Sequence, residues 1–470
     1  MKNKIISKLE EIVGKDDISL NKAELYIYGF DASIHHHNAD IVLRPESAKE
    51  VSEILKIANK NSIPIVPRGS GSGLSGQAVP IKGGIVLDMT KMNRIKKIEL
   101  NDLYCIVEPG VVNDALNLEL SKYKFWFPPT PGSGAWCTIG GMVATNASGM
   151  KAIKYGATRD YVLGLEVVLP NGKIVRVGTK TLKNSSGYQL EKLFIGSEGT
   201  LCVITEITLR LLPMPRSRAG ALISFSSIKN AGEFVSKIIS FPIIPAAIEI
   251  MDRVCIKAVN KTMATNFPED EAILIIEVDG SEEEVKENIS IIEKIGTQDK
   301  IEVSMDNNVI DKWLDGRKAV MPALSRGIEN TVSVSLVDDL AMPISKLAET
   351  MEMIQKISNK YGIIIAIYGH AGDGNLHTKF LVDPTNIKVW KTSEKAIEEI
   401  YEKVLEFGGT VSGEHGIGIS KAPYMQKERK DSIEIMKNIK AVIDKNNIMN
   451  PKKIFDWKGS IINYLRYPMK

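Results

Sequence analysis

The chain has 470 residues, of which 44% are apolar and 25% are charged, and its formal net charge at pH 7 is +3. A chain of this length and composition buries globular cores without disulfide staples. Its balanced charge argues against a nucleic-acid partner, and no apolar run approaches the ~18–20 residues of a membrane span, so we expect a cytoplasmic, multidomain enzyme.

The first part of the chain is predicted to be an α+β domain. A helix, a short strand over 40–44 and a second helix that ends near Lys60 come first. Short strands separated by glycine clusters follow, over 63–67, 84–89, 105–108, 164–169, 173–177 and 201–211. Glycine loops between strands argue against a regular βαβ winding. The composition changes at Leu212-Pro-Met-Pro-Arg, which predicts a first domain over residues 1–215.

Strands and helices alternate in the next part of the chain. Strands are predicted over 219–224, 247–251 and 273–278, and helices over 230–239, 253–262 and 282–295. This alternation indicates a sheet covered by helices on one face. Two further helices are predicted over 391–407 and 432–444. We therefore expect a second domain over 216–455 and a tail over 456–470.

A glycine-rich loop lies between Pro67 and Pro80. It contains Gly71-x-Gly73-x-x-Gly76, which formally matches the dinucleotide fingerprint. That fingerprint must open a helix, whereas proline, two glycines and a strand follow here. We therefore expect a strand–loop–strand nest whose backbone amides bind an anion such as pyrophosphate.

Two further loops have a similar composition, over 138–149 and 196–201. Small residues let a planar ligand lie against bare backbone, and the amide and hydroxyl groups provide hydrogen bonds. Each loop alone is as well explained by a tight turn. Three of them in one domain indicate a large dinucleotide.

Together with 154–166 and 194–206, these loops resemble the FAD-binding domain of the p-cresol methylhydroxylase/vanillyl-alcohol oxidase superfamily. The whole chain resembles D-lactate dehydrogenases and the D subunit of glycolate oxidase. The resemblance implies an α+β fold: a two-subdomain FAD-binding domain and a C-terminal antiparallel-sheet cap covered by helices. It also implies FAD, bound non-covalently because residues 67–80 lack the histidine to which some relatives attach it.

The resemblance assigns FAD contacts to residues of the three loops and of the closing segment. These are Pro67, Arg68, Gly69, Ser70, Gly71, Ser72, Gly73, Leu74, Pro131, Gly132, Thr138, Gly140, Gly141, Asn146, Ser148, Gly149, Glu198, Gly199, Ile204 and Asn450. Cys202 stands where the family has glycine. The chain has four cysteines, none within three residues of another, so we expect buried reduced thiols and no iron–sulfur cluster.

Six histidines occur, and three of them form the run His35-His36-His37. Such a run binds metal or lies in an exposed polar loop, and we expect the exposed loop. The other three are His370, His377 and His415, in Gly369-His-Ala-Gly-Asp-Gly-Asn-Leu-His and Ser412-Gly-Glu-His-Gly.

The first of these motifs predicts a hairpin that places two histidines together. With strands over 363–368 and 376–382 and a two-residue turn at Asp373-Gly374, His370 lies directly opposite His377. Two such imidazoles can share one divalent metal, and Glu414 can supply a carboxylate. A pair of stacked surface histidines is the alternative. The family resemblance implies metal ligands at the same three positions, and zinc, iron and manganese all remain open.

Three further residues are expected to act on the substrate. His415 points away from Glu414 if the segment is extended, and it is the expected general base, or else it only orients Glu414. Arg317 resembles the family's substrate arginine and would clamp a carboxylate, unless it is a surface arginine. Asn375 is expected to hydrogen-bond substrate or flavin. Met321 and the apolar Val332, Val334 and Val337 favour a small monocarboxylate.

Together with the resemblance, on which the preference for the D enantiomer rests alone, these residues predict a metal-dependent dehydrogenase that oxidises a small D-2-hydroxy acid, D-lactate foremost, to the 2-oxo acid by hydride transfer to flavin N5. The electrons need a partner: an electron-transferring flavoprotein, as in electron-bifurcating lactate dehydrogenases, or an iron–sulfur subunit, as in glycolate oxidase. The alternatives are a glycolate or D-2-hydroxyglutarate dehydrogenase subunit, an oxidase that reduces oxygen, and a non-catalytic FAD electron carrier.

Overall fold

The computed structural model describes residues 3–263, 265–296, 300–327, 331–455, 459–460 and 463–467. The chain divides into two compact units. Unit 1 consists of Met1–Ser148, Ala157–Met214 and Glu414–Arg466. Unit 2 consists of Gly149–Gly156 and Pro215–Gly413, together with Tyr467. The predicted tail over 456–470 lies largely outside the described residues.

This division differs from the domain boundaries predicted from the sequence. The sequence analysis assigns 216–455 to one domain, whereas Glu414–Arg466 groups with unit 1 and Gly149–Gly156 with unit 2. Long-range polar contacts account for the second case. Lys151 Nζ lies 2.9 Å from Glu277 Oε1, and Lys154 Nζ lies 2.6 Å from Asp279 Oδ1. These ion pairs connect the short helix α6 (Ala152–Tyr155) to strand β14 (Ala272–Gly280). Local composition carries no trace of such contacts.

The first subdomain of unit 1 is a four-stranded sheet. Strands β1 (Ile18–Ser19), β2 (Ile41–Leu43), β4 (Ile85–Asp88) and β3 (Ile65–Arg68) lie in this order. Strands β2, β4 and β3 are parallel, and β1 is antiparallel to β2. Helix α3 (Ala48–Lys60) connects β2 to β3 and begins at Ser47, whose hydroxyl accepts from the Glu50 amide. Helices α1 (Asn3–Val13) and α2 (Lys22–Ile27) complete the subdomain.

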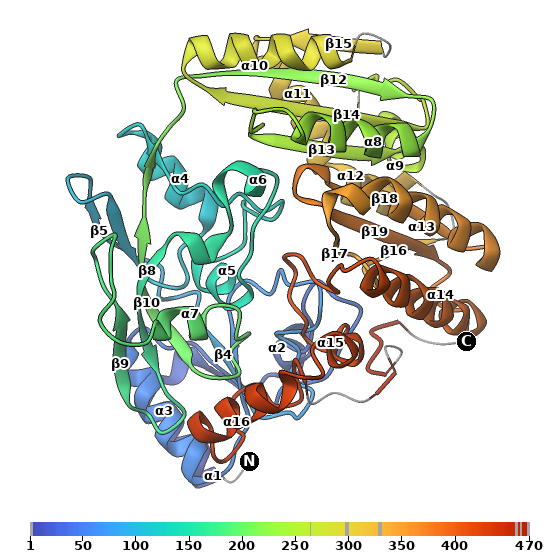
Figure 1. Ribbon diagram of the computed structural model, residues 1–470. Coiled ribbons are helices and arrows are strands. Elements are labelled where there is room, and N and C mark those ends of the chain that lie inside the picture. The colour runs from blue at the N-terminus through green and yellow to red at the C-terminus, as the bar shows by residue number, and fades with distance from the viewer. Residues whose placement is uncertain are drawn as a thin grey trace. The chain divides into compact units, whose positions relative to one another are not determined.

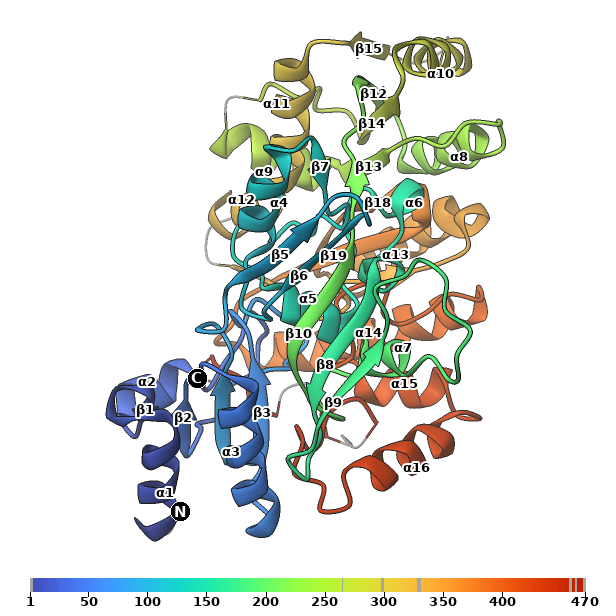
Figure 2. The same ribbon diagram turned by 90° about the vertical axis from the view of Figure 1, so that its left-hand side faces the viewer.

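The second subdomain of unit 1 is a five-stranded antiparallel sheet. Its order is β5 (Ile95–Glu99), β6 (Tyr104–Val107), β10 (Val203–Arg210), β8 (Val162–Val168) and β9 (Ile174–Gly178) (Figure 2). Helices α4 (Asn113–Ser121), α5 (Ile139–Thr145) and α7 (Leu190–Phe194) belong to it, as does the strand pair β7 (Phe125–Trp126) and β11 (Leu212–Pro213). The prediction of two small α+β subdomains is confirmed. Helices α15 (Ala422–Glu428) and α16 (Ile433–Ile443) lie in Glu414–Arg466, the returning segment, which follows unit 2 in the chain and belongs to unit 1.

Unit 2 is built on one large antiparallel sheet (Figure 1). Its order is β15 (Lys300–Ser304), β12 (Ser217–Phe225), β14 (Ala272–Gly280), β13 (Ala247–Asp252), β18 (Ile364–His370), β19 (Asn375–Val382) and β16 (Val332–Val334). The short strand β17 (Leu340–Ala341) also pairs with β19. The expected antiparallel sheet is therefore confirmed, and β13, β18 and β19 lie side by side within it.

Helices cover this sheet on both faces, so the expectation of one covered face is wrong. Helices α9 (Arg253–Thr262), α11 (Asn307–Lys318) and α12 (Val320–Gly327) share one core with the sheet, and Gly220 of β12 faces Ile310 of α11. Five residues later, on the opposite face, Phe225 packs on Phe234 of α8 (Ile228–Ile239) with ring centroids 5.3 Å apart. Every residue of Ala272–Asp279 is buried. Because neighbouring side chains point to opposite faces, a strand buried at every residue is covered on both sides.

The remaining helices of unit 2 are α10 (Glu282–Ile295), α13 (Leu347–Tyr361) and α14 (Ile387–Glu406). Helix α10 contacts β12 and β14, and α13 packs between α8 and α14. Within the described ranges, no helix combines the length and the apolar character needed to cross a membrane.

The histidine run near the N-terminus is not the exposed loop that its composition predicts. His35 is 0% exposed, with Nδ1 3.3 Å from the Asn463 carbonyl oxygen and Nε2 3.0 Å from Ser420 Oγ. The His36 ring lies 4.5 Å from the Tyr26 ring. Burial, aided by the charge of Lys453, lowers the pKa of His35 to about 3. Partners so distant in sequence could not be inferred from a polar local composition.

Protonation of His35 is predicted to destabilise unit 1 in acid. Its pKa is about 3 in the folded chain against an ordinary 6.5, so between these values only the unfolded state binds the proton. Stability is therefore lost as the pH falls below 6.5, by up to about 5 kcal/mol. The melting temperature followed by circular dichroism should depend less on pH in His35→Gln than in the wild type. His37→Gln is the control that should keep the wild-type dependence, and equal slopes in all three would contradict the prediction.

Candidate functional site

The first glycine loop of unit 1 runs between two parallel strands. It leaves β3 after Arg68 and enters β4, and no helix begins within it. The predicted strand–loop–strand arrangement is therefore confirmed. Arg68 lies beneath the loop, where Nη1 donates to the Phe30 carbonyl at 2.8 Å. Gly71 has a φ of +73°, and a Cβ there would collide with the Arg68 guanidinium, so only glycine fits.

The second loop lies directly against the first. Thr138 caps helix α5, and its Oγ1 accepts from the Gly141 amide at 3.2 Å. A Cβ at Gly69 would collide with the same Thr138 oxygen. Farther along this loop, the hydroxyl of Ser148 donates to Glu414 Oε2 at 2.9 Å. The side chain of this predicted FAD residue therefore contacts a predicted metal ligand.

The third loop joins the second through its backbone. The Gly196 amide donates to the Val143 carbonyl at 3.0 Å, and the Glu198 amide donates to the Ala144 carbonyl at 2.8 Å. A Cβ at Gly199 would lie 3.1 Å from Pro67, at the start of the first loop. The three loops that the sequence singled out therefore converge in unit 1.

Asn450 ties the first and third loops together. Its Nδ2 donates to the Gln77 carbonyl at 2.9 Å and to the Glu198 carbonyl at 2.8 Å. The side chain is buried, and Oδ1 has no hydrogen-bond partner among the described residues. A buried acceptor without a donor, at the junction of two glycine loops, suits the hydrogen-bond donors of a bound dinucleotide.

The other predicted FAD residues lie on the same loops, just before them, or on the adjoining strands. Gly149 is the residue at which the chain passes into unit 2. The remainder are Ser70, Ser72, Gly73, Leu74, Pro131, Gly132, Gly140, Asn146 and Ile204. Cys202 is buried in the core of the second subdomain, and burial raises the pKa of its thiol. All four cysteines are free and buried, which confirms the prediction of reduced core thiols.

The candidate site of unit 2 is centred on Glu249, which the sequence analysis missed. Glu249 lies on β13, directly opposite His370 of β18, and is 1% exposed. One carboxylate oxygen lies 2.7 Å from His370 Nδ1, and the other lies 2.7 Å from Arg317 Nε. One buried carboxylate thus holds a predicted metal ligand and the predicted substrate arginine. The available signal was a single acid within the apolar segment Ala247–Met251.

The histidine hairpin forms, but its predicted register is wrong by two residues. The turn spans 371–374, so His370 pairs with Asn375 and Tyr368 pairs with His377. The two histidines are therefore diagonal neighbours on one face of the sheet, with ring centroids 4.9 Å apart. The short 3₁₀ turn over Ala371–Asp373 precedes the left-handed Gly374 and lengthens the connection beyond the expected two residues.

Both histidines are oriented in the manner of metal ligands. His370 Nδ1 faces Glu249, and His377 Nδ1 lies 2.8 Å from the Asp338 carbonyl oxygen. A ligand-forming atom of each histidine lies within 4.8 Å of one on the other. Metal-binding histidines commonly donate one ring N–H to a carboxylate or carbonyl so that the other nitrogen faces the metal. The residues present therefore fit a divalent metal.

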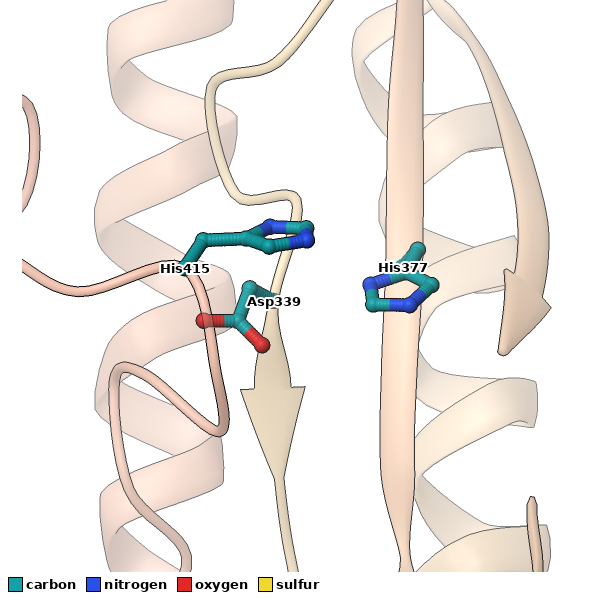
Figure 3. A group of neighbouring side chains, drawn as sticks. All are labelled: Asp339, His377 and His415. Atoms are coloured by element: carbon teal, nitrogen blue, oxygen red, sulfur yellow. The ribbon is translucent and has the colours of Figure 1, made fainter. Parts of the chain in front are cut away.

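Asp339 is a further acid beside the histidines that the sequence analysis missed. A carboxylate oxygen of Asp339 lies within 4.8 Å of a ring nitrogen of His377, and Figure 3 shows the two side chains, from the segment before β17 and from β19. Asp339 Oδ1 accepts from Asn375 Nδ2 at 2.9 Å, and Oδ2 accepts from Ser412 Oγ at 2.6 Å. Asn375 Oδ1 is buried and has no hydrogen-bond partner among the described residues.

Glu414 and His415 begin the segment that returns to unit 1. The preceding residue, Gly413, belongs to unit 2 and donates its amide to the Asp339 carbonyl at 3.2 Å. His415, the third side chain in Figure 3, has Nε2 3.4 Å from Glu414 Oε1. The two side chains face each other, so the expectation that they point in opposite directions is wrong. The chain bends at 413–415 and is not extended there.

Arg317 is buried, which contradicts the alternative of a surface arginine. It is 5% exposed, its guanidinium carbon lies 4.6 Å from the centre of the Tyr368 ring, and its Nη2 has no hydrogen-bond partner among the described residues. A second buried cation, Lys379, lies 3.2 Å from Asp338 Oδ2. Burial opposes the charge of Lys379, but Tyr368, Asp338 and its other neighbours outweigh it and raise the pKa. Buried donors in excess of their partners suit an anionic ligand.

The predicted selectivity residues are placed unevenly. Met321, one turn of helix after Arg317, is 42% exposed, whereas Val334 and Val337 are buried and Val332 is half-buried. The preference for a small monocarboxylate stays a prediction.

Two family patterns match the chain. The FAD binding domain matches residues 39–178, and the C-terminal domain of FAD linked oxidases matches residues 214–454. The glycolate oxidase subunit GlcD of Bacillus subtilis is 37% identical over 454 residues, which cover 95% of this chain and 96% of that protein. The mitochondrial D-lactate dehydrogenase [cytochrome] of Arabidopsis thaliana is 35% identical over 460 residues, 96% of this chain and 80% of that protein.

The fold is also similar to that of a solved flavoprotein. The crystal structure of p-cresol methylhydroxylase with substrate bound superposes with a TM-score of 0.78 over 97% of each chain, at 18% identity. This likeness confirms the fold that the sequence resemblance implied.

Asn450→Asp is predicted to lower the retention of FAD. The new carboxylate would face the carbonyl oxygens of Gln77 and Glu198, to which Asn450 now donates, and would push the two loops apart. We expect at least a tenfold loss of FAD affinity, measured by fluorescence titration of the apoprotein. Asn447→Asp is the matched control, because Asn447 is also left-handed but exposed. Equal FAD affinity in both variants would contradict the role of Asn450.

Proposed function

The chain belongs to the FAD-linked oxidases and is an FAD-dependent oxidoreductase, and on this premise we propose that it oxidises a small D-2-hydroxy acid, D-lactate foremost, to the 2-oxo acid. The observation that carries the proposal is the buried group Arg317–Glu249–His370. It combines a cation with unsatisfied donors and a histidine oriented as a metal ligand. A 2-hydroxy acid presents a carboxylate and a hydroxyl on adjacent carbons, which are the groups that such a pair would bind.

The proposed metal ligands are His370, His377 and Glu414. The Nδ1 contacts of the two histidines support the first two assignments. The assignment of Glu414 is supported by its neighbour in the chain. Gly413 donates its amide to the Asp339 carbonyl, and the Cα of Glu414 follows that of Gly413 at about 3.8 Å. Zinc, iron and manganese are all compatible with two imidazoles and a carboxylate. A divalent metal bound there would supply a Lewis acid that lowers the pKa of the substrate hydroxyl.

Arg317 is proposed to bind the substrate carboxylate. Its Nη2 is buried without a partner, and the Tyr368 ring beneath the guanidinium fixes its plane. Glu249 neutralises only one edge of the guanidinium, so the group can still accept a second anion. Lys379 adds a second buried positive charge on the same strand as His377.

His415 is proposed to take the hydroxyl proton. Its Nε2 lies 3.4 Å from Glu414 Oε1, so the ring is next to a proposed metal ligand, and imidazole is the side chain that most often acts as a general base. Asn375 Oδ1 is a buried acceptor suited to orient the substrate hydroxyl. FAD, held by the converging loops of unit 1, would supply the two-electron acceptor for the hydride from the substrate carbon.

The electrons are proposed to pass to a partner protein, and we favour an electron-transferring flavoprotein over an iron–sulfur subunit. All four cysteines are buried and free, so the chain has no cysteine cluster to carry electrons onward.

The names of the relatives include both a D-lactate dehydrogenase and a glycolate oxidase subunit. The choice of acid is therefore the first thing to measure.

The proposed function predicts reduction of the flavin by substrate without any partner. The FAD-loaded protein is mixed anaerobically with D-lactate, L-lactate, glycolate or D-2-hydroxyglutarate, and the visible flavin absorbance is followed. We expect one D-acid to bleach the flavin fastest. Removal of metal with a chelator should abolish the bleaching, and re-addition should restore it. His415→Gln should slow it by roughly 10²–10⁴-fold, the usual contribution of a general base.

His37→Gln is the matched histidine control, because this side chain lies outside the proposed site, and it should be reduced at the wild-type rate. If none of the four acids reduces the wild type with FAD and metal bound, the 2-hydroxy-acid proposal is wrong. Peroxide formed in air at the rate of substrate consumption would identify an oxidase instead.

Glu249→Gln is predicted to weaken metal binding and substrate binding together. Loss of the carboxylate removes the group that orients His370, which commonly costs 10–100-fold in metal affinity. Arg317 loses its counter-ion in the same change, so the KM for the acid should also change. Metal affinity is measured by competition with a chromogenic chelator. Glu277→Gln is the control, because Glu277 is equally buried on the neighbouring β14 but contacts Lys151. Unaltered metal affinity in Glu249→Gln would contradict the prediction.

A further inference from the structure

We propose that Glu198 is a positioning residue that fixes the segment from which Glu414 and His415 project. The inference rests on the proposed function, because it assigns a role to Glu198 in the same reaction. The sequence resemblance assigns Glu198 to FAD, but its carboxylate is directed at residues 416–418 of the returning segment. All of the residues concerned belong to unit 1.

Both carboxylate oxygens of Glu198 are occupied by backbone amides. Oε1 accepts from the Ile417 amide at 2.6 Å, and Oε2 accepts from the Gly418 amide at 2.8 Å. The side chain is 5% exposed, so these bonds form away from water. Burial raises the pKa of Glu198 to about 7, while the Ile417 and Gly418 amides favour its charged form, whose hydrogen bonds are about twice as strong as neutral ones.

The turn that receives this carboxylate requires two glycines. Gly416 and Gly418 have φ values of +75° and +52°, and the left-handed residues turn successive amides toward one side. A Cβ at Gly416 would lie 2.6 Å from Glu198 Oε1. The close approach of the carboxylate therefore depends on glycine at 416, whereas a Cβ at Gly418 would collide with the Ser75 carbonyl.

The backbone of Glu198 is itself held in an unfavourable conformation. Its φ of +51° is left-handed, a backbone region that residues with a Cβ rarely adopt. Two bonds hold it there: its amide donates to Ala144, and its carbonyl accepts from Asn450. A left-handed conformation persists where neighbouring groups hold it in place. Here it directs the Glu198 carboxylate to the segment after His415.

Two residues of the first glycine loop hold the same segment. Gln77 Nε2 donates to the His415 carbonyl at 2.5 Å, and Ser75 Oγ donates to the Gly416 carbonyl at 3.2 Å. The Ile419 amide donates to the Ser75 carbonyl at 2.8 Å. The segment that carries the proposed base is thus bonded along its length to the loops that form the proposed FAD site. Glu198 contributes the only charged group among these tethers in the described residues.

The role of Glu198 can be separated from cofactor binding with Glu198→Gln. Glutamine keeps the size of the side chain but places an NH₂ group against one of the two amides, so one bond is lost. We expect FAD content to stay at the wild-type value and the melting temperature to fall only slightly, because the other bonds of the segment remain. Hydrogen exchange of a peptide covering 413–420, measured by mass spectrometry, should become faster. The kcat for the acid should fall roughly 10- to 100-fold with KM changed less than about twofold.

Glu206→Gln is the matched control. Glu206 is also a buried carboxylate of unit 1, but its partners are Lys96 and Arg176, remote in sequence from residues 413–420. This variant should leave both the exchange of the 413–420 peptide and the kcat at wild-type values. The kcat per bound FAD gives a further distinction, because it should fall in Glu198→Gln, whereas a simple loss of folded protein would lower FAD content and activity together.

Three results would overturn the assignment of Glu198. They are unchanged exchange at 413–420, faster exchange with an unchanged kcat, and loss of FAD in proportion to the loss of activity, which would make Glu198 a cofactor ligand. Failure of the proposed function has a different signature: no acid reduces the wild type. In that case the exchange measurement still decides whether Glu198 holds the segment.

Discussion

The buried carboxylate of Glu249 is the interaction on which the candidate site of unit 2 depends. A charge that is 1% exposed is stable only if both of its oxygens are compensated, and here Arg317 and His370 compensate one oxygen each. Removal of one partner from such a buried group commonly costs about 3–5 kcal/mol. The proposed substrate cation and the first proposed metal ligand are therefore held by the same group, and neither can move without leaving part of the charge of Glu249 uncompensated.

Unit 1 solves a different problem, because its loops must stay open to a large ligand and still be rigid. Backbone bonds from Gly196 and Glu198 to helix α5, together with the Asn450 amide, hold the loops to one another. Glycine permits the close approaches, as at Gly71 over Arg68. The same loops continue into the contacts of Ser75, Gln77 and Glu198 with the segment after Glu414. Cofactor loops and proposed catalytic base are thus parts of one hydrogen-bonded structure.

Much of the fold could be predicted from local pattern. Pro80 and the glycines after it excluded a helix after the first loop, and the structure has a strand there. The helices that begin at Ser47 and Ser281 have capping residues that are visible in the sequence. The single-face expectation for unit 2 failed at β14, where the apolar run Ala272–Ile276 has no alternation and predicts a strand covered on both sides.

The sequence by itself determined the residue types of the site: glycine loops for a dinucleotide, and His370 and His377 on one hairpin. These follow from short-range rules of turns, strand alternation and donor chemistry, which act within a few residues. Only the tertiary structure decided the register of the hairpin, the burial of His35, and the places of Glu249 and Asp339. Each depends on a partner distant in the chain, and the free energy of burying a charged or polar group is set by that partner, which no local pattern contains.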